Sequence, residues 1–209
     1  MGTSNWQNIS YCVELIRKIN PQRILDVGIG FGRWGILSRE FLEVWNQKIY
    51  SKDWNLQIDG IEIFEPNVEE YHKYFYSNIF KADATSFVKN IKDNYDLIII
   101  GDMLEHLEKE KGLEFLRDCL YKTKYLLLNI PIGEKWEQDE IYGNKYERHL
   151  SAWKLRDFKP FNIITKKNFR DYLYRRFAVL ILSNTENDLP PDSKLYTSLR
   201  FHLLRFMKK

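Results

Sequence analysis

The sequence lacks several features that would set it apart from ordinary globular proteins. None of its 209 residues belong to an apolar run of 18, so no transmembrane helix is expected. The first residues lack the basic and apolar regions of a signal peptide. There is no internal repeat and no low-complexity tract. These absences argue against a membrane-spanning or exported chain and favour a globular protein of the cytoplasm.

Cysteine is scarce, and so is any excess of one charge. The two cysteines, Cys12 and Cys119, stand far apart in helix-like segments, so we expect reduced, buried thiols in a cytoplasmic protein. Lys and Arg total 32 and Asp and Glu total 29, which gives a net charge of +3. Proteins that act on nucleic acid usually carry a stronger basic excess, so nucleic acid is not favoured as a partner.

What the chain does have is enough apolar sequence for a well-packed domain. Hydrophobic residues make up 44% and aromatic residues 15%. A chain of this length buries about 70% of the surface that it would expose when unfolded, so it needs no disulfide or structural metal. Apolar runs alternate with helical patterns, which predicts an α/β fold with a mostly parallel sheet covered by helices on both faces. The expected strands are residues 23–28, 57–62, 79–83, 95–101 and 125–130, with a closing pair at 163–167 and 177–183.

The expected helices complete this pattern. An N-terminal helix lies within residues 1–20, with Asn8 or Ser10 as its cap, and others are expected at 33–45, 66–76, after residue 101 to about 120, and at 151–158. Residues 132–152 are polar and aromatic with little periodicity. A loop of this length in a compact domain is usually functional, so we expect a lid over a site.

The last segment, residues 186–209, has a different composition. If it is helical, its apolar residues share one face and its basic residues lie off that face. Three hypotheses remain for it: a helix docked on its own domain, a homodimer contact, or a peripheral contact with an acidic membrane surface.

Three glycines follow the first predicted strand and precede a helix. Gly28, Gly30 and Gly32 would let the backbone turn tightly and approach a ligand, with the N-terminus of the helix behind them. A dinucleotide site would have another glycine where this chain has Arg33, and an acid roughly 20 residues further on. The acid that ends the second strand, Glu62, lies much further along the chain, so both differences argue against NAD.

The arrangement Asp26-x-Gly28-x-Gly30-x-Gly32 resembles motif I of the class I S-adenosylmethionine-dependent methyltransferases. Segments 60–63 (Gly-Ile-Glu-Ile) and 82–84 (Ala-Asp-Ala) look like the second and third motifs of that family. Residues 95–106 look like its fourth strand and catalytic edge. The resemblance covers about residues 20–185 and implies a doubly wound, mostly parallel, seven-stranded Rossmann-like sheet, with a methyltransferase domain in residues 1–185.

The resemblance also implies roles for individual residues. Glu62 would bind the two ribose hydroxyls of S-adenosylmethionine, and Ile63 would lie against the adenine. Asp83 would accept from the adenine amino group, and Asp26 would lie near the ammonium of the methionine part. The full set of expected cofactor-binding residues is Asp26, Gly28, Gly30, Gly32, Glu62, Ile63, Asp83, Ala84 and Asp102.

Three hypotheses compete for the residues after the fourth strand. In the first, Asp102 and Glu105 form a helix capping box and have no catalytic role. In the second, His106 or His149 is a general base for a substrate hydroxyl, with Asp102 beside it. In the third, Asp102, Glu105, His106 and His149 hold a divalent metal. The last pattern is similar to the small-RNA 3′-terminal 2′-O-methyltransferases, although this chain has Asp where that family's pattern begins with Glu.

The predicted lid offers Trp136, Tyr142, Tyr146 and Glu147 as substrate contacts. The leading hypothesis is an enzyme that transfers a methyl group from S-adenosylmethionine to an oxygen, less favourably a nitrogen, of a small molecule or a glycan. One alternative is a metal-dependent RNA 2′-O-methyltransferase. Another is a module that binds S-adenosylmethionine without catalysis.

Overall fold

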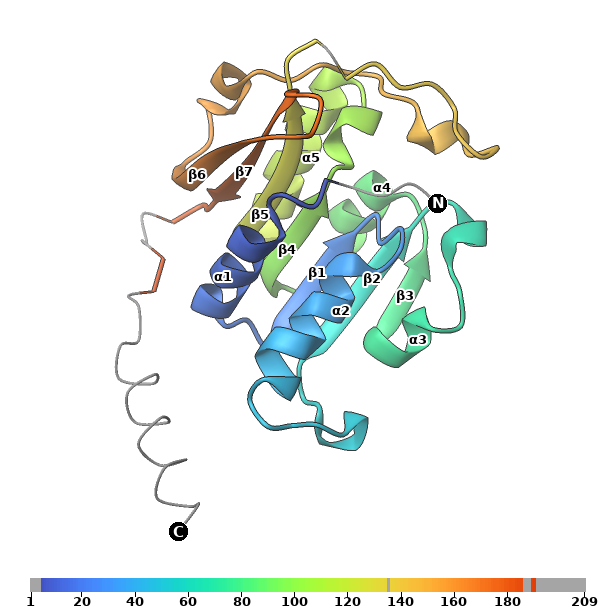
Figure 1. Cartoon of the computed structure of the whole chain (residues 1–209), viewed down its shortest axis with the longest axis vertical. Helices are drawn as coiled ribbons and strands as arrows, with labels where there is room; N and C mark the ends of the chain where they lie inside the picture. Colours follow the sequence, from blue (N-terminus) through green and yellow to red (C-terminus); the bar gives the residue numbers. More distant parts are fainter. Residues whose placement is uncertain (1–4, 135, 186–188, 191–209) are drawn as a thin grey trace.

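The computed structural model describes residues 5–134, 136–185 and 189–190, and these form a seven-stranded sheet with helices on both faces (Figure 1). The strand order is β3-β2-β1-β4-β5-β7-β6. The first five strands are parallel, and β7 is antiparallel to both of its neighbours. The strands are β1 (Arg23–Val27), β2 (Gln57–Glu62), β3 (Asn78–Lys81), β4 (Tyr95–Gly101), β5 (Thr123–Ile132), β6 (Ile163–Arg170) and β7 (Arg176–Leu182).

The helices divide between the two faces of the sheet. One face carries α1 (Ile9–Ile19) and α2 (Arg33–Arg39), which continues as a π-helical segment at Glu40–Val44. The other face carries α4 (Ala84–Asn90) and α5 (Lys109–Lys122). This arrangement confirms the predicted doubly wound, mostly parallel sheet.

The strands are apolar throughout because both of their faces are buried. In β4, Leu97 and Ile99 pack in the core beneath α1 and α2, while Ile98 and Ile100 pack in the core beneath α4 and α5. All four side chains are fully buried. The sheet therefore separates two hydrophobic cores, each with its own layer of helices.

Several predicted helices are shorter in the structure. Residues 66–76 do not form one helix but a 3-10 turn at Glu65–Asn67 and a single turn, α3, at His72–Phe75. The backbone is extended at Val68, which interrupts the helical pattern. Residues 151–158 contain only a 3-10 turn at Leu155–Phe158.

Other elements were missed, or lie outside the part described. The helix α4, whose N-cap is Asp83, was not predicted from the sequence. The predicted C-terminal helix at 186–209 lies outside the described residues apart from 189–190, so its three hypotheses stay predictions. Among the described residues, no helix is long and apolar enough to cross a membrane.

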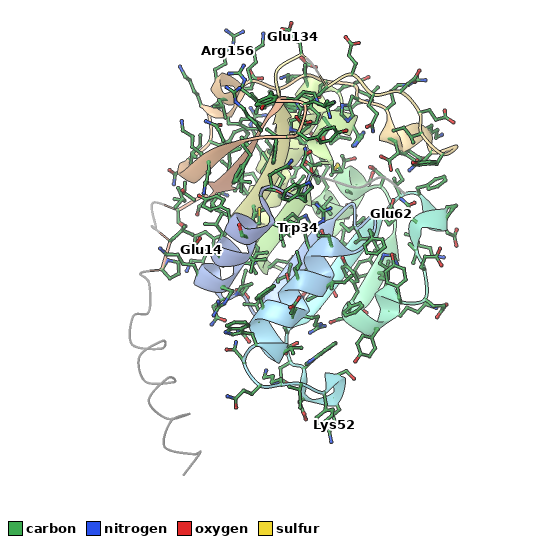
Figure 2. All side chains as sticks on the ribbon, in the orientation of Figure 1. Glu14, Trp34, Lys52, Glu62, Glu134 and Arg156 are labelled. Atoms are coloured by element: carbon green, nitrogen blue, oxygen red, sulfur yellow. The ribbon has the colours of Figure 1, made fainter. Side chains whose placement is uncertain are left out.

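The topology fixes where a ligand can bind. The strand order reverses between β1 and β4, and loops after these two strands leave in opposite directions, which opens a crevice at the carboxyl edge. The long loop after β5 crosses this edge, at the top of Figure 1. Figure 2 places Glu134, at the start of that loop, at the opposite end of the molecule from Lys52.

Candidate active site

A cavity of about 500 Å³ lies at the carboxyl edge of the sheet. Its wall combines the loop after β1, the ends of β2 and β4, and the long loop after β5. This volume falls within the usual range for small-molecule sites. We refer to it below as the main cavity.

The glycine loop forms one side of the main cavity. Gly28, Gly30 and Gly32 all have positive φ angles, of 73°, 48° and 82°, in the left-handed region that side chains disfavour. A Cβ placed on Gly30 would meet no atom within 4 Å, so open space lies beside the backbone there. Gly28 and Gly30 line the cavity, whereas a Cβ on Gly32 would lie 2.9 Å from the ring of His72, beneath the loop.

His72 supports the glycine loop, and the sequence analysis did not single it out. The fully buried imidazole accepts at Nδ1 from the Glu69 backbone N–H at 3.0 Å. Its Nε2–H is therefore free to donate to the Gly30 carbonyl, 3.0 Å away. No local pattern reveals this contact, because Gly30 and His72 are 42 residues apart in the sequence.

Asp26 lies beneath the loop rather than in the wall of the main cavity. Its carboxylate is 1% exposed and accepts a hydrogen bond of 2.6 Å from the Tyr76 hydroxyl. Burial raises the pKa of Asp26 to about 7, although the Tyr76 hydrogen bond acts in the opposite direction. Asp26 is not among the residues of the cavity wall, and the expected contact with the methionine ammonium stays a prediction.

Glu62 lies at the end of β2, in the wall of the main cavity. Its Oε2 accepts from the Gly30 N–H at 3.1 Å, and its Oε1 accepts from the Phe64 N–H at 2.9 Å. These two bonds hold the carboxylate beside the glycine loop. Ile63 lines the cavity next to it, and so does the buried side chain of Asn67, which the sequence analysis missed.

Asp83 and Ala84 also line the main cavity. The Asp83 carboxylate caps α4 by accepting from the backbone N–H groups of Thr85 and Ser86 at 3.3 and 3.1 Å. Burial raises its pKa, but hydrogen bonds from the hydroxyls of Thr85 and Ser86, together with those from their N–H groups, outweigh burial and lower it. Asp83 thus has a structural role as well as a position on the cavity wall.

Arg33 and Asp102 place opposite charges in the same cavity wall. Burial lowers the pKa of Arg33, and the charge of Asp102 acts in the opposite direction, so the two groups interact electrostatically. Asp102 adopts a φ of 54°, in the left-handed region that is uncommon for residues with a side chain and that Asp adopts more readily than most. Arg33 entered the sequence analysis only as a departure from the NAD pattern.

The capping-box hypothesis for Asp102 and Glu105 is wrong. The helix after β4 is a 3-10 turn at Leu104–His106 that follows Met103, with no side-chain cap. The main helix, α5, begins only at Lys109. Glu105 instead points into a buried position at the cavity, with 2% of its surface exposed.

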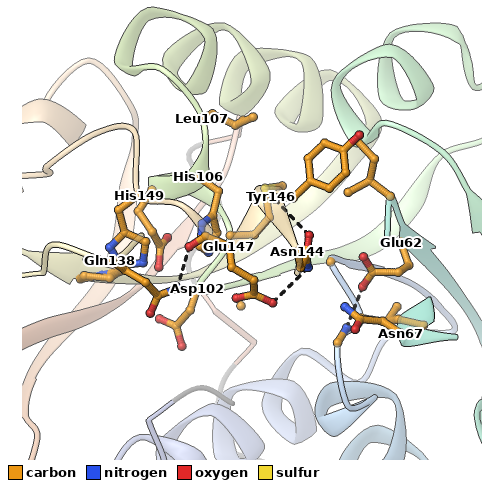
Figure 3. A pocket seen from close by; sticks show the side chains of 18 of the residues that line it. Glu62, Asn67, Asp102, His106, Leu107, Gln138, Asn144, Tyr146, Glu147 and His149 are labelled. Carbon is orange, nitrogen blue, oxygen red and sulfur yellow. Dashed lines mark hydrogen bonds between the residues drawn. The ribbon is translucent and has the colours of Figure 1, made fainter. Parts of the chain in front are cut away.

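His106 and His149 meet at one end of the main cavity (Figure 3). His106 Nδ1 lies 3.1 Å from the Arg148 carbonyl, and His149 Nδ1 is hydrogen-bonded to the Trp136 carbonyl. A carbonyl can only accept, so Nδ1 carries the hydrogen in both rings and Nε2 keeps its lone pair. Burial lowers the pKa of both imidazoles, which favours the neutral form that acts as a base or a metal ligand.

Three of the four predicted metal ligands converge. Single ligand atoms of Glu105, His106 and His149 lie within 4.8 Å of one another, and Asp102 is not part of this group. Burial and the Asp102 carboxylate raise the pKa of Glu105 well above its usual range. Its Oε2 has no hydrogen-bond partner among the described residues. A carboxylate and two imidazoles with such an orphaned oxygen fit a divalent cation.

The loop after β5 covers this end of the cavity. Of the four expected substrate contacts, Trp136, Tyr146 and Glu147 line the cavity, as does Asn144, whereas Tyr142 is 79% exposed and lies outside the described cavity wall. The side chain of Asn144 accepts from the Tyr146 N–H at 3.0 Å. In Figure 3 this part of the loop lies between the histidines at one end and Glu62 at the other.

Hydrogen bonds at two points hold the loop in place. The Glu105 carbonyl accepts from the backbone N–H groups of Leu150 and Ser151 at 2.9 and 3.1 Å. At the other end, Trp136 Nε1 donates to the Arg176 carbonyl at 2.8 Å, on the edge of β7. The loop is therefore attached to the turn after β4 on one side and to the last strand on the other.

Comparisons with known proteins give structural likeness but no sequence match. No protein-family model matches the chain, and no curated protein matches it. Solved structures with a similar fold include TehB from Haemophilus influenzae, with 15% identity and a TM-score of 0.57 over 84% of this chain. The chain spans 62% of the length of TehB.

Two further structures are similar over nearly their whole length. The magnesium protoporphyrin IX methyltransferase ChlM from Synechocystis PCC 6803, solved with bound S-adenosylmethionine, has 15% identity and a TM-score of 0.56, with 88% of this chain and 86% of ChlM covered. The methyltransferase domain of bacterial CtHen1 has 15% identity and a TM-score of 0.52, with 85% of this chain and 97% of that domain covered. At these identities the likeness establishes the fold.

Proposed function

We propose that this chain, which has the fold of the class I S-adenosylmethionine-dependent methyltransferases, transfers a methyl group from S-adenosylmethionine to an oxygen of a small-molecule or glycan acceptor. One observation carries the proposal. A single cavity holds the glycine loop with Glu62 at one end and two neutral imidazoles at the other. Oxygen is favoured over nitrogen because a hydroxyl needs a base to take its proton.

The residues present fit this cofactor. When bound, S-adenosylmethionine supplies a methyl group on a sulfonium whose leaving group is a neutral thioether. Glu62, fixed by its two backbone hydrogen bonds, would accept from the ribose hydroxyls, with Ile63 and Ala84 against the base. Asp83, which caps α4 and lines the main cavity, would accept from the adenine amino group.

The methionine end of the cofactor carries a carboxylate and an ammonium group, and the chain offers one charge for each. We assign Arg33 to the carboxylate and Asp102 to the ammonium, because both line the main cavity and already interact electrostatically. Asp26 would act indirectly, from beneath the loop.

His149 is the proposed general base. Its Nδ1 hydrogen is committed to the Trp136 carbonyl, so Nε2 is left to take the proton of the acceptor hydroxyl. We prefer His149 to His106 as the base because His149 belongs to the loop that would cover the acceptor. Trp136, Tyr146 and Glu147 line the same region and would orient the acceptor and exclude water.

Isothermal titration with S-adenosylhomocysteine tests the cofactor assignment. The wild-type protein should bind it, and NAD should give no heat. Glu62→Gln should weaken binding about tenfold or more, because charge-assisted hydrogen bonds to the ribose are lost. Glu65→Gln is the matched control, because Glu65 is exposed and pairs with Lys81. Binding of NAD alone would end the proposal.

A second candidate function is metal-assisted transfer to a ribose hydroxyl. The cluster of Glu105, His106 and His149 favours it, since a cation held there would lower the pKa of a neighbouring hydroxyl. Titration with Mn²⁺ should then show one site that is lost in Glu105→Gln, and transfer to an RNA 3′ end should depend on it. If Mn²⁺ does not bind and transfer to RNA does not depend on it, the metal-assisted reaction is excluded and the metal-free reaction is retained.

A chain that binds the cofactor without turnover is the third alternative. It predicts that S-adenosylhomocysteine binds normally while no methyl transfer depends on His149.

The expected site of action is the cytoplasm, because Cys12 and Cys119 are both free and buried, as suits a reducing compartment.

A further inference from the structure

A second cavity, of about 490 Å³, lies beside the main cavity and is strongly basic. Four of its lining residues are cations and one, Glu134, is an acid. They come from the start of the long loop, from the segment before the last 3-10 turn, and from the β6–β7 hairpin. We call it the basic cavity; its cations are Lys154, Arg170, Arg175 and Arg176.

Two of these cations face each other without compensation. Arg170 and Arg176 are directly opposite in the register of β6 and β7, so their side chains leave the same face of the hairpin. Like charges at such positions repel and destabilise the pair. Within the described ranges, neither arginine forms an ion pair with a carboxylate. A bound anion would relieve this repulsion.

The other two cations are fixed in place. Arg175 Nε lies 2.8 Å from Asp171 Oδ2, and its guanidinium stacks over the Trp136 ring with its carbon 4.0 Å from the centroid. Lys154 Nζ lies 2.9 Å from Glu134 Oε1. Two acids thus oppose four cations, and three of the cations are guanidinium groups, which match phosphate oxygens in a bidentate manner.

The basic cavity adjoins the proposed reaction site. Arg175 lines both cavities. Trp136 joins them as well: its carbonyl accepts from His149, and its indole N–H donates to the Arg176 carbonyl at 2.8 Å. Trp136 and Arg175 thus lie between His149 and the other arginines, and an acceptor that spans both cavities would contact these two side chains.

We propose that the basic cavity binds a phosphate or diphosphate ester group of the acceptor while the hydroxyl to be methylated faces His149. The inference rests on the proposed function and narrows its substrate class to phosphorylated small molecules. A long RNA is the weaker fit, because its path would need a basic stripe, whereas the net charge is only +3 and the four cations gather at one cavity.

Titration with inorganic pyrophosphate tests the proposal directly. The wild-type protein should bind one equivalent, with inorganic phosphate weaker and acetate weaker still. The double variant Arg170→Gln/Arg176→Gln should lose at least tenfold in affinity, and Arg170→Lys/Arg176→Lys should recover part of it. The matched control is Lys159→Gln/Lys166→Gln, which removes two exposed cations that line neither cavity and should change nothing.

S-adenosylhomocysteine binding, measured on the same variants, separates the two proposals. It should be equal in all of them, and pyrophosphate should bind equally well with and without it. Failure of S-adenosylhomocysteine to bind would remove the proposed function but leave the pyrophosphate result as it stands. Equal pyrophosphate affinity in the Gln variant, or displacement by S-adenosylhomocysteine, would overturn the phosphate site. Tighter binding of an oligoribonucleotide that depends on Lys159 and Lys166 would overturn it in favour of RNA.

Discussion

The rings of His106 and His149 lie with their centroids 4.9 Å apart and their planes inclined at 69°. One ring comes from the turn after β4, and the other comes from the loop after β5. Each donates from Nδ1 to a backbone carbonyl of that loop, so the loop itself determines which nitrogen faces the cavity. The pair is therefore complete only when the loop lies over the sheet edge.

Replacement of the proposed base should separate binding from turnover. His149→Gln should lower kcat by about 10²- to 10⁴-fold, because no group remains to take the hydroxyl proton. Affinity for S-adenosylhomocysteine should stay within twofold of the wild type. Glu140→Gln, on an exposed part of the same loop, is the control. Steady-state kinetics measures kcat, and calorimetry measures the affinity for S-adenosylhomocysteine. An equal loss in kcat and in this affinity would contradict the role of His149 as the base.

The activity should remain high at mildly acidic pH. Burial lowers the pKa of His106 and His149 below 6.5, and the neutral imidazole is the active form. Turnover should therefore decline only when the pH falls below the lowered pKa values of these histidines. An unperturbed histidine would already be half protonated at a pH of about 6.5. A pH profile of kcat/KM measures this. A midpoint above 6.5 would be inconsistent with the buried, neutral rings.

Asp26 should make stability depend on pH. Its pKa is raised from 3.8 to about 7 in the folded state, so the folded protein binds one more proton than the unfolded chain between these values. The stabilisation is fully present below pH 3.8 and is lost as pH rises to about 7. Asp26→Asn should therefore flatten this part of the stability curve and be more stable than the wild type at pH 8.

Urea unfolding at pH 5, 6, 7 and 8 would show the difference between Asp26→Asn and the wild type. Asp93→Asn is the control, because its side chain is 72% exposed. A constant difference between Asp26→Asn and the wild type across the range would mean that Asp26 is ionised in the folded protein throughout.

His72 should act as a positioning residue for the cofactor. His72→Leu removes the hydrogen bond to the Gly30 carbonyl and should raise KM for S-adenosylmethionine by about tenfold, with a smaller effect on kcat. His72→Gln keeps a donor and should recover part of the affinity. A purely structural role would instead lower stability equally in both variants without changing KM in the folded fraction.

The sequence predicted the sheet better than the short helices. Strands such as β4 are continuous apolar runs, and their pattern alone indicates burial on both faces. The segment 66–76 carries helix-forming residues, but its backbone is extended at Val68, and the buried ring of His72 contacts the glycine loop. Such tertiary contacts leave no local periodicity.

The same distinction applies to the candidate site. Gly30 and Glu62 could be found because Gly30 follows the first predicted strand and Glu62 ends the second, and the structure brings them within hydrogen-bond distance. Arg33 and Asn67 belong to no recognisable sequence pattern. They are only close in sequence to Gly30 and Glu62. The proximity of His106 and His149 could be expected only from the predicted fold. Their spacing in the sequence does not indicate which loop returns to this edge of the sheet.

The division of the interior into two cores has a consequence for how such a protein can diversify. His72 and Tyr76, which support the glycine loop, lie on the α2 side of the sheet, and Tyr76 packs in that core. Trp153 and Phe158, which anchor the far end of the long loop, pack in the opposite core beside α5. Mutations that repack the far end of the long loop are thus absorbed on the α5 side of the sheet, so this loop can change while His72 and Tyr76 keep their contacts beneath the glycine loop.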